Sequence, residues 1–224
     1  MKRVLLGWLA AAALVQGAAA ADLSLAPLYK APPTEAAQAY SWTGFYFGAN
    51  GGGGWGHSVW SGNATGIGLS GGQAGGTVGY NQQLGKVVLG IEADADWSAL
   101  DGKSTSPGCP IGCSTSDSWL STVRGRVGYA FDRIMPYVTG GLAVGDIRAA
   151  TPGFPGGEAV NPGWAAGAGI ELALPGNWSA KAEYLRVDLG RFNCTGCGAF
   201  PPDNVSLQEN VFRAGINYHF GWGK

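Results

Sequence analysis

Segments in which apolar and polar side chains alternate recur along this chain, and they limit its possible folds more than any other feature. Alternation with a period of two indicates a β-strand, because successive side chains of a strand point to opposite faces. The eight segments are residues 43–55, 72–82, 86–97, 118–130, 134–145, 163–173, 177–188 and 210–220. Soluble strands most often have about 5 or 6 residues, whereas strands that cross a bilayer have about 9–11. The pattern therefore predicts an all-β protein whose strands are long enough to cross a membrane.

The connections between these segments alternate in length. Tight turns are predicted at 83–85, 131–133 and 174–176, and long polar loops at 56–71, 98–117, 146–162 and 189–209. A closed barrel in an outer membrane has short periplasmic turns and long extracellular loops, whereas a soluble sandwich has no reason to collect its long loops at one end. The order predicts an eight-stranded antiparallel up-and-down transmembrane β-barrel with both chain ends on the short-turn side.

Charged side chains occupy one face of the predicted strands. In VVLGIEADADW, residues 87–97, every second residue from Glu92 to Asp96 is an acid, and the residues between them are apolar. In a soluble protein the acids would face water, but in a membrane barrel the apolar face meets lipid and the polar face is enclosed. We expect the acids to share Arg124 and Arg126, which lie on the matching face of 118–130. The predicted interior charge network is Glu92, Asp94, Asp96, Arg124, Arg126, Glu171, Lys181, Glu183 and Arg213.

Energetics favour pairing within this predicted network. An isolated buried charge costs several kcal/mol, and five acids against four bases nearly cancel. The interior of an eight-stranded barrel is just wide enough for side chains to fill. The sequence therefore predicts a barrel whose polar interior is plugged by ion pairs.

Aromatic residues stand near the ends of the predicted strands. Trp119 and Tyr129 lie ten steps apart, about 33 Å along a strand, and a tilt of roughly 40° reduces this to about 25 Å. This is the height of the apolar band between the two aromatic girdles of a membrane barrel. The predicted girdle residues are Trp97, Trp119, Tyr129, Trp178, Tyr184, Phe212, Tyr218 and Phe220.

The N-terminal region has the layout of an export signal. Lys2 and Arg3 precede an apolar run, and 18–20 are alanines typical of a cleavage site. We predict a signal peptide at residues 1–21, a Pro- and Ala-rich linker at 22–40 and a barrel domain at 41–224. The nine Trp, eight Tyr and eight Phe argue against disorder. The net charge of −1 argues against a nucleic-acid partner, which would require a basic face.

Several of these segments resemble a known family. YKAPP, SWTGFYFGANGGGGWG, EADADW, STVRGRVGYAFDRIMPYVTGGLAVG, GWAAGAGIELAL, KAEYLRVDLG and FRAGINYHF are similar to the porin-like outer-membrane proteins of alpha-proteobacteria with an OmpA-type barrel. The resemblance covers nearly the whole mature chain. It implies an outer-membrane location, lipid and lipopolysaccharide as neighbours, and the outer-membrane insertion machinery as a partner. The closing GWGK departs from the terminal aromatic usual in that family.

The four cysteines form two close pairs, each in a predicted long loop. Three connectivities are possible, and export favours disulfides. We predict the local pairs Cys109–Cys113 and Cys194–Cys197. The alternatives are a four-thiolate zinc site, which would require both loops to meet, and a redox pair, which lacks a thioredoxin-like context.

Two histidines and one arginine are the remaining candidates for a site. His57 falls in the first predicted loop and His219 on the inward face of the last strand, and neither has a serine and an acid at a spacing suited to acyl transfer. Haem ligation would rest on His57 alone. Arg186 lies on the outward face near the extracellular end, where it either snorkels or contacts a lipopolysaccharide phosphate. We therefore predict no catalytic residue, cofactor or metal.

The sequence thus favours a structural surface barrel, without enzymatic activity, that contributes to envelope integrity. The alternatives are a small-solute channel and a surface protein that binds a ligand such as haem, or acts as an adhesin, through its loops. Conductance in a planar bilayer distinguishes a channel from a plugged barrel.

Overall fold

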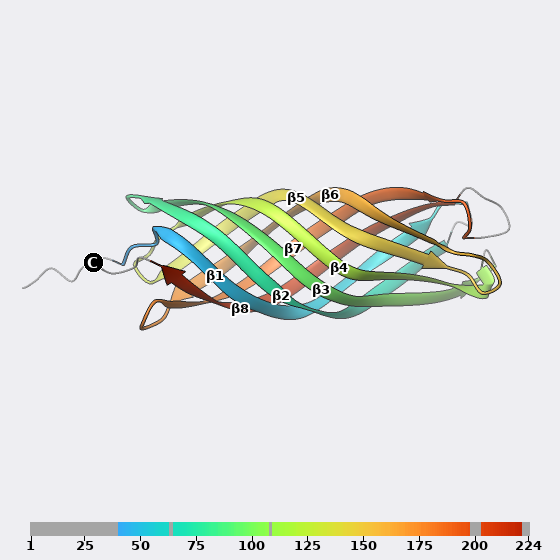
Figure 1. The fold of residues 1–224 in the computed structure, drawn as a ribbon, viewed down its shortest axis with the longest axis horizontal. Coiled ribbons are helices and arrows are strands. Elements are labelled where there is room, and N and C mark those ends of the chain that lie inside the picture. Colours follow the sequence, from blue (N-terminus) through green and yellow to red (C-terminus); the bar gives the residue numbers. More distant parts are fainter. Residues whose placement is uncertain (1–39, 63–64, 108, 198–202, 221–224) are drawn as a thin grey trace, which may run out of the picture. The chain divides into compact units, whose positions relative to one another are not determined.

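The computed structural model describes residues 40–62, 65–107, 109–197 and 203–220. The predicted signal peptide, most of the linker and the closing GWGK lie outside these residues and stay predictions. The strands are β1 (Gly44–Trp60), β2 (Thr65–Leu84), β3 (Val87–Ser106), β4 (Cys109–Tyr129), β5 (Ile134–Ala150), β6 (Gly157–Ala173), β7 (Trp178–Cys194) and β8 (Asp203–Phe220). Each strand pairs antiparallel with its neighbours in chain order, and β1 pairs with β8, so the sheet closes (Figure 1). The predicted fold class is confirmed.

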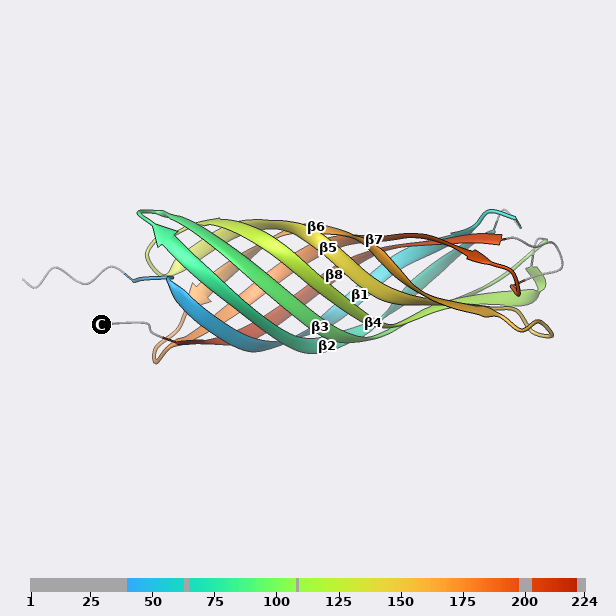
Figure 2. The same cartoon turned by 45° about the horizontal axis from the view of Figure 1, so that its top comes forward.

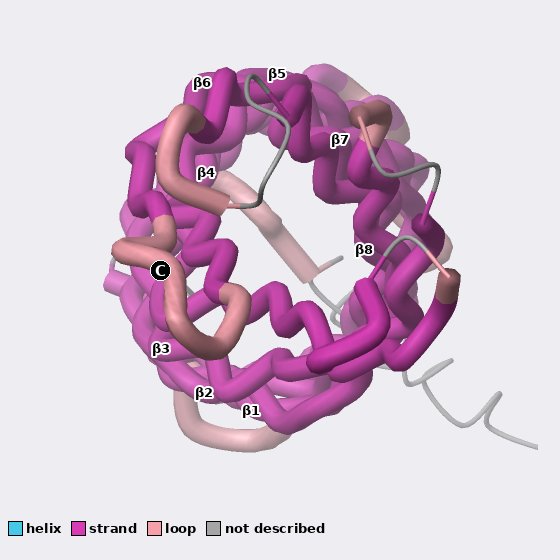
Figure 3. The backbone as a smooth tube through the Cα atoms, turned by 90° about the vertical axis from the view of Figure 1, so that its right-hand side faces the viewer, coloured by secondary structure: helices cyan, strands magenta, loops and turns pink. Residues whose placement is uncertain are grey.

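Viewed along its axis, the barrel is a ring of strands (Figure 3). The tight turns after β2, β4 and β6 lie at the end where β1 begins and β8 ends (Figure 2). We call this the inner end and the opposite one the outer end. Gly85, Asp132 and Asn177 adopt positive φ in these turns, a conformation that Gly, Asn and Asp tolerate best. The turn residues therefore suit the reversals that they make.

The predicted long loops at the outer end are mostly strand, which corrects the expected strand bounds. β1 continues to Trp60 and β2 begins at Thr65, so most of 56–71 is paired backbone. The same is true of 98–117, 146–162 and 189–209, where the neighbouring strands continue beyond their predicted ends. The strands have 17–21 residues. The barrel is therefore much longer than the apolar band that crosses a bilayer.

The reason is an inversion of the apolar phase along several strands, among them β2, β5, β7 and β8. In the inner half of β8, Phe212 and Ile216 point outward, and Arg213 points inward and is buried. In its outer half, Leu207 is a fully buried inward residue, and Gln208 is on the outward phase. The inner half thus has the apolar-out pattern of a membrane barrel. The outer half has the apolar-in pattern of a soluble barrel, which keeps the chain paired beyond the bilayer.

Closure of the sheet predicts resistance to detergent. No edge strand is available from which unzipping could begin, since β1 and β8 are paired from Phe45 to Trp60. We expect the unboiled protein in SDS to migrate differently from the boiled protein on an electrophoresis gel. Identical migration of the two samples would contradict a closed barrel.

Candidate functional site

Arg124 lies at the centre of an ion-pair network inside the inner half of the barrel. Its Nη2 is 2.7 Å from Glu92 Oε1 and 2.7 Å from Asp94 Oδ2, and its Nη1 is 3.1 Å from Glu183 Oε1. Glu92 is the direct register partner of Arg124 on β3, whereas Glu183 reaches it from β7. All four side chains are buried. Arg124 therefore joins opposite walls of the barrel.

Arg126 and Lys181 extend the network towards the inner end. Arg126 Nη2 is 2.5 Å from Glu171 Oε2, and its Nη1 is 3.3 Å from Glu92 Oε2. Lys181 Nζ donates to the same Glu92 oxygen at 2.9 Å. Tyr46 also donates to Glu92 Oε2, at 2.8 Å. Glu92 thus contacts three cationic side chains and accepts a hydrogen bond from one phenol. These contacts offset the free-energy cost of burying its charge.

Asp96 has a different partner from the one expected. Its Oδ2 is 2.6 Å from Arg213 Nη1, and it forms no ion pair with Arg124 or Arg126. Arg213 Nη2 also contacts Asp94 Oδ1 at 2.9 Å and Glu183 Oε2 at 2.8 Å. The structure therefore brings all nine predicted interior charges into one buried network, but it pairs Asp96 with β8.

Polar side chains outside the predicted set also belong to this network. Thr77 and Thr122 donate to the two carboxylate oxygens of Asp94, at 2.7 and 2.9 Å. Tyr137 donates to Glu183 Oε1 at 3.1 Å. Each of these residues is on the inward phase of its strand. That phase was the sequence signal that could have identified them.

Ser179, His219 and Glu171 come together near the inner end, although their spacing in the sequence does not predict this contact. Ser179 Oγ is 2.8 Å from His219 Nε2 and donates to Glu171 Oε1 at 2.5 Å. Glu171 Oε1 is also 3.4 Å from the same His219 nitrogen. In an acyl-transfer triad the acid contacts the other ring nitrogen. All three side chains are buried, so this group joins the interior network and does not offer an accessible nucleophile.

Trp42, just before β1, covers the inner end of this network. Its side chain is fully buried, its Nε1 donates to the Asp132 carbonyl at 3.0 Å, and its backbone N–H donates to Gln83 Oε1 at 2.7 Å. Trp42 packs in a small apolar cluster that includes Val88 and Met135. The turns thus hold the Trp42 side chain at the inner end of the barrel.

The interior changes character in the outer half. Buried apolar side chains form one cluster there, here called the outer core. It consists mainly of Trp60, Ile67, Leu69, Leu120, Ala143, Ile147, Leu185, Val187, Leu189, Phe192, Val205, Leu207, Val211 and both disulfides. Glu209 and Asp117 are buried beside these apolar side chains. Burial raises the pKa of Glu209 to about 7. Burial and then the nearby Glu209 raise the pKa of Asp117 to about 8.

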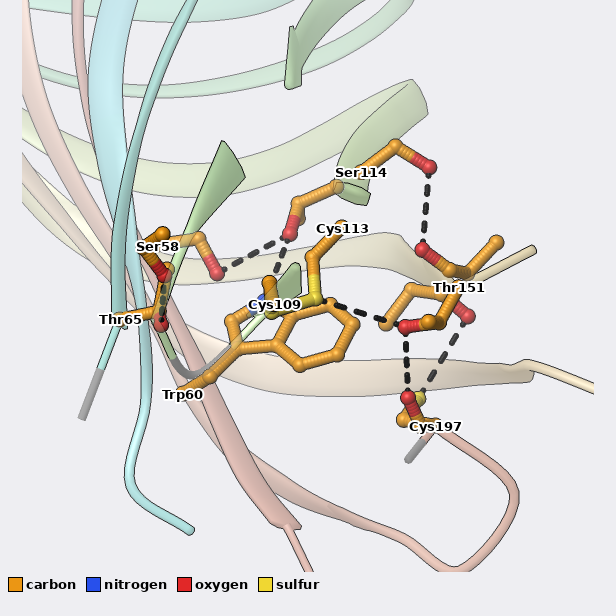
Figure 4. The surroundings of a disulfide bond; sticks show 12 residues. Ser58, Trp60, Thr65, Cys109, Cys113, Ser114, Thr151 and Cys197 are labelled. Carbon is orange, nitrogen blue, oxygen red and sulfur yellow. Dashed lines mark hydrogen bonds between the residues drawn. A yellow bond between two sulfur atoms is a disulfide. The ribbon is translucent and has the colours of Figure 1, made fainter. Parts of the chain in front are cut away.

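The disulfides join Cys109 to Cys113 and Cys194 to Cys197 at the outer end. Cys109, Cys113 and Cys194 lie in strands, and Cys197 lies in the connection that follows β7. Thr151 stands between them, since its Oγ1 is 3.4 Å from Cys113 Sγ and donates to the Cys197 carbonyl at 2.6 Å (Figure 4). This pairing leaves no thiolate for the four-cysteine zinc alternative.

The two disulfides predict how the cysteines respond to alkylation. Alkylation of the denatured, unreduced protein is expected to modify no cysteine, and peptide mapping to recover the two local pairs. Replacing Cys194 and Cys197 together by Ser should cost about 2 kcal/mol of unfolding free energy, the value for closing so short a loop. A peptide that joins Cys113 to Cys194 would contradict the local pairing.

Outward aromatic side chains form two girdles around the inner half. The inner girdle contains the predicted Tyr129, Trp178, Tyr218 and Phe220, together with Phe45, Phe47 and Tyr80. The outer girdle contains the predicted Trp97, Trp119, Tyr184 and Phe212, together with Trp55 and Trp164. Ring contacts connect neighbouring strands, as between Trp178 and Tyr218 at 5.1 Å. The apolar band between the girdles marks the part of the barrel that lipid covers.

Arg186 and His57 lie beyond the outer girdle on the outward face. Arg186 donates to Gln208 Oε1 at 2.8 Å and to Asn210 Oδ1 at 3.2 Å. His57, expected in a loop, is in β1 opposite Gln208. His219 is buried at the inner end, so the two histidines lie at opposite ends and cannot ligate one haem together.

Known proteins resemble this chain over most of its length. The outer membrane protein beta-barrel domain family matches residues 9–220. The 31 kDa outer-membrane immunogenic protein of Brucella melitensis is 36% identical over 98% of this chain and 100% of the relative. The 25 kDa outer-membrane immunogenic protein of that organism is 32% identical over 84% of each chain. The crystal structure of Neisserial surface protein A is 15% identical, covers 80% of this chain and 98% of its own, and has a TM-score of 0.46.

Proposed function

Since this chain belongs to the outer-membrane β-barrel domain family and resides in the bacterial outer membrane, we propose that it is a closed, non-catalytic surface barrel that contributes to envelope integrity. The observation that carries this proposal is that buried side chains occur along the length of the interior. Trp42 lies at the inner end, the ion-pair network around Arg124 lies in the inner half, and the outer core lies beyond it.

These buried side chains favour a plugged barrel over a small-solute channel. Large porins leave an aqueous channel, whereas the interior of an eight-stranded barrel is about the width of its side chains. A solute or ion would have to cross both an ion-pair network and an apolar core. Leu185, Leu189 and Leu207 of the outer core are fully buried, so they offer no polar path to a hydrated ion.

The outer half supports the role of a surface protein. β3 continues from Trp97 to Ser106, which carries the sheet about 30 Å along the strand beyond the outer girdle. The outer core and the disulfides hold this part of the barrel in paired strands. The described part of the outer half therefore presents a protrusion of paired strands on the cell surface.

Planar bilayer recordings test the closed interior. We expect no steady conductance from the purified full chain. We expect none from Trp42→Ala either, because this substitution leaves the outer core unchanged. A porin of known conductance, inserted in the same bilayer, confirms that channels are detected. Steady steps from the wild-type protein would overturn the plugged barrel and favour the channel.

Envelope integrity is tested in the bacterium. A strain that lacks the protein is expected to become more sensitive to detergent and to large hydrophobic antibiotics, and the wild-type gene is expected to restore resistance. Unchanged sensitivity after deletion would contradict the structural role and leave the closed barrel without that function.

A further inference from the structure

A polar pocket lies on the outward face of β7, β8 and β1, on the outer side of the outer girdle. Its volume is about 360 Å³, and its lining includes His57, Arg191 and Gln208 with Ser61, Asn204 and Ser206. These strands are adjacent, since Gln208 pairs with His57 on one side and with Asp188 on the other. The pocket is therefore formed by paired backbone of three strands, on the outside of the closed barrel.

A hydrogen-bond network connects this pocket to the girdle below it. Arg186 donates to Gln208 and to Asn210, and Tyr184 donates to Asn210 Oδ1 at 2.6 Å. The Tyr184 ring lies 6.4 Å from the Trp55 ring. Arg186 is two residues beyond Tyr184, about 5 Å further from the membrane centre after allowance for strand tilt. The guanidinium is thus held at the height where lipid headgroups begin.

Neither arginine of this sector forms an ion pair with a described side chain. Arg186 donates to the neutral amides of Gln208 and Asn210, and no described acid lies within ion-pair distance of Arg191. Asp188 accepts from the Gly190 N–H and from Gln208. On β5, by contrast, Arg148 contacts two acids, Asp146 and Glu158, at 3.1 Å each. The β7–β8–β1 sector therefore has cationic groups available for a ligand.

We propose that this pocket binds a phosphorylated headgroup of lipopolysaccharide in the outer leaflet. A phosphate group carries about two negative charges and matches the fork of N–H donors on an arginine. Ser, Asn and Gln side chains can bind the hydroxyls of a sugar. Trp55 and Tyr184 would contact the upper parts of its acyl chains. The inference rests on the outer-membrane location and does not depend on whether the interior is closed.

Binding of lipid A to the purified full chain in detergent micelles tests this site. We expect the bis-phosphorylated form to bind at least tenfold more tightly than the dephosphorylated form, because charge-assisted hydrogen bonds are the strong ones. The double variant Arg186→Gln, Arg191→Gln should lose that preference. Arg148→Gln, which removes an outward arginine already paired with acids, should keep it.

Several outcomes would overturn the proposal. They are equal binding of the two lipid A forms, an unchanged preference in the double variant, or an equal loss in Arg148→Gln. Displacement of lipid A by millimolar inorganic phosphate would also contradict it, by indicating a site for the free ion. Heat-modifiable migration on a gel verifies that each variant is folded. If the double variant fails to fold, the single variant Arg191→Gln changes only an exposed side chain and is expected to weaken the preference for phosphate.

Discussion

Replacing Arg124 by Ala is expected to lower the free energy of unfolding by about 3–5 kcal/mol, the cost of breaking a buried ion pair from one side. Arg124 contacts Glu92, Asp94 and Glu183, and all three acids are buried. Its removal leaves these acids with only the remaining cations of the network. Urea unfolding in phospholipid vesicles, followed by tryptophan fluorescence and by gel migration, measures the loss.

The neighbouring Val123 provides a matched control. Its side chain is on the outward phase, in the band between the girdles, and is half exposed on the isolated barrel. Val123→Ala is expected to cost much less than Arg124→Ala, because lipid fills the gap that the shorter side chain leaves. If Val123→Ala proved the more damaging variant, the two faces of the strands would be assigned backwards.

The inner half of the barrel is predictable from the sequence, because lipid and the enclosed interior impose opposite demands on the two faces. The alternation of Glu92 and Asp94 with Ile91 and Ala93 is enough to place the acids inside. The register is not predictable in the same way. Arg213 meets Asp96 across the barrel, from a position 117 residues away in the chain. That contact depends on closure of the whole sheet.

The outer half is harder to predict because its pattern is weaker and inverted. The segments there are rich in Gly, Ser and Pro, which are typical of loops. Their apolar residues are sparse, and many of them, such as Ile147 and Leu207, occur on the face that is polar in the inner half. If these segments continued the membrane-spanning pattern, their inward apolar side chains would face a polar interior. Their position is explained by the apolar core inside the barrel beyond the bilayer.

Glu209 breaks the pattern of the outer core, and we expect Glu209→Gln to stabilise the barrel at neutral and alkaline pH. The side chain is fully buried, and neither carboxylate oxygen has a hydrogen-bond partner among the described residues. Burial raises the pKa of Glu209 from 4.5 to about 7. An acid whose pKa is raised by folding binds more protons in the native state, so stability falls as pH rises between those two values. The full loss is about 3 kcal/mol.

The difference in unfolding free energy between Glu209→Gln and the wild type, measured from pH 4 to pH 9, isolates this effect. The variant is expected to gain relative stability from about pH 4.5 and to reach its full advantage above pH 7, where the wild-type carboxylate is charged. Glu158→Gln removes an exposed acid from β6 and should leave the pH dependence as it is in the wild type. The pKa of Asp117, which Glu209 helps to raise to about 8, should fall in Glu209→Gln. A constant difference between Glu209→Gln and the wild type across this pH range would mean that water reaches the carboxyl group and that the outer core is not closed around it.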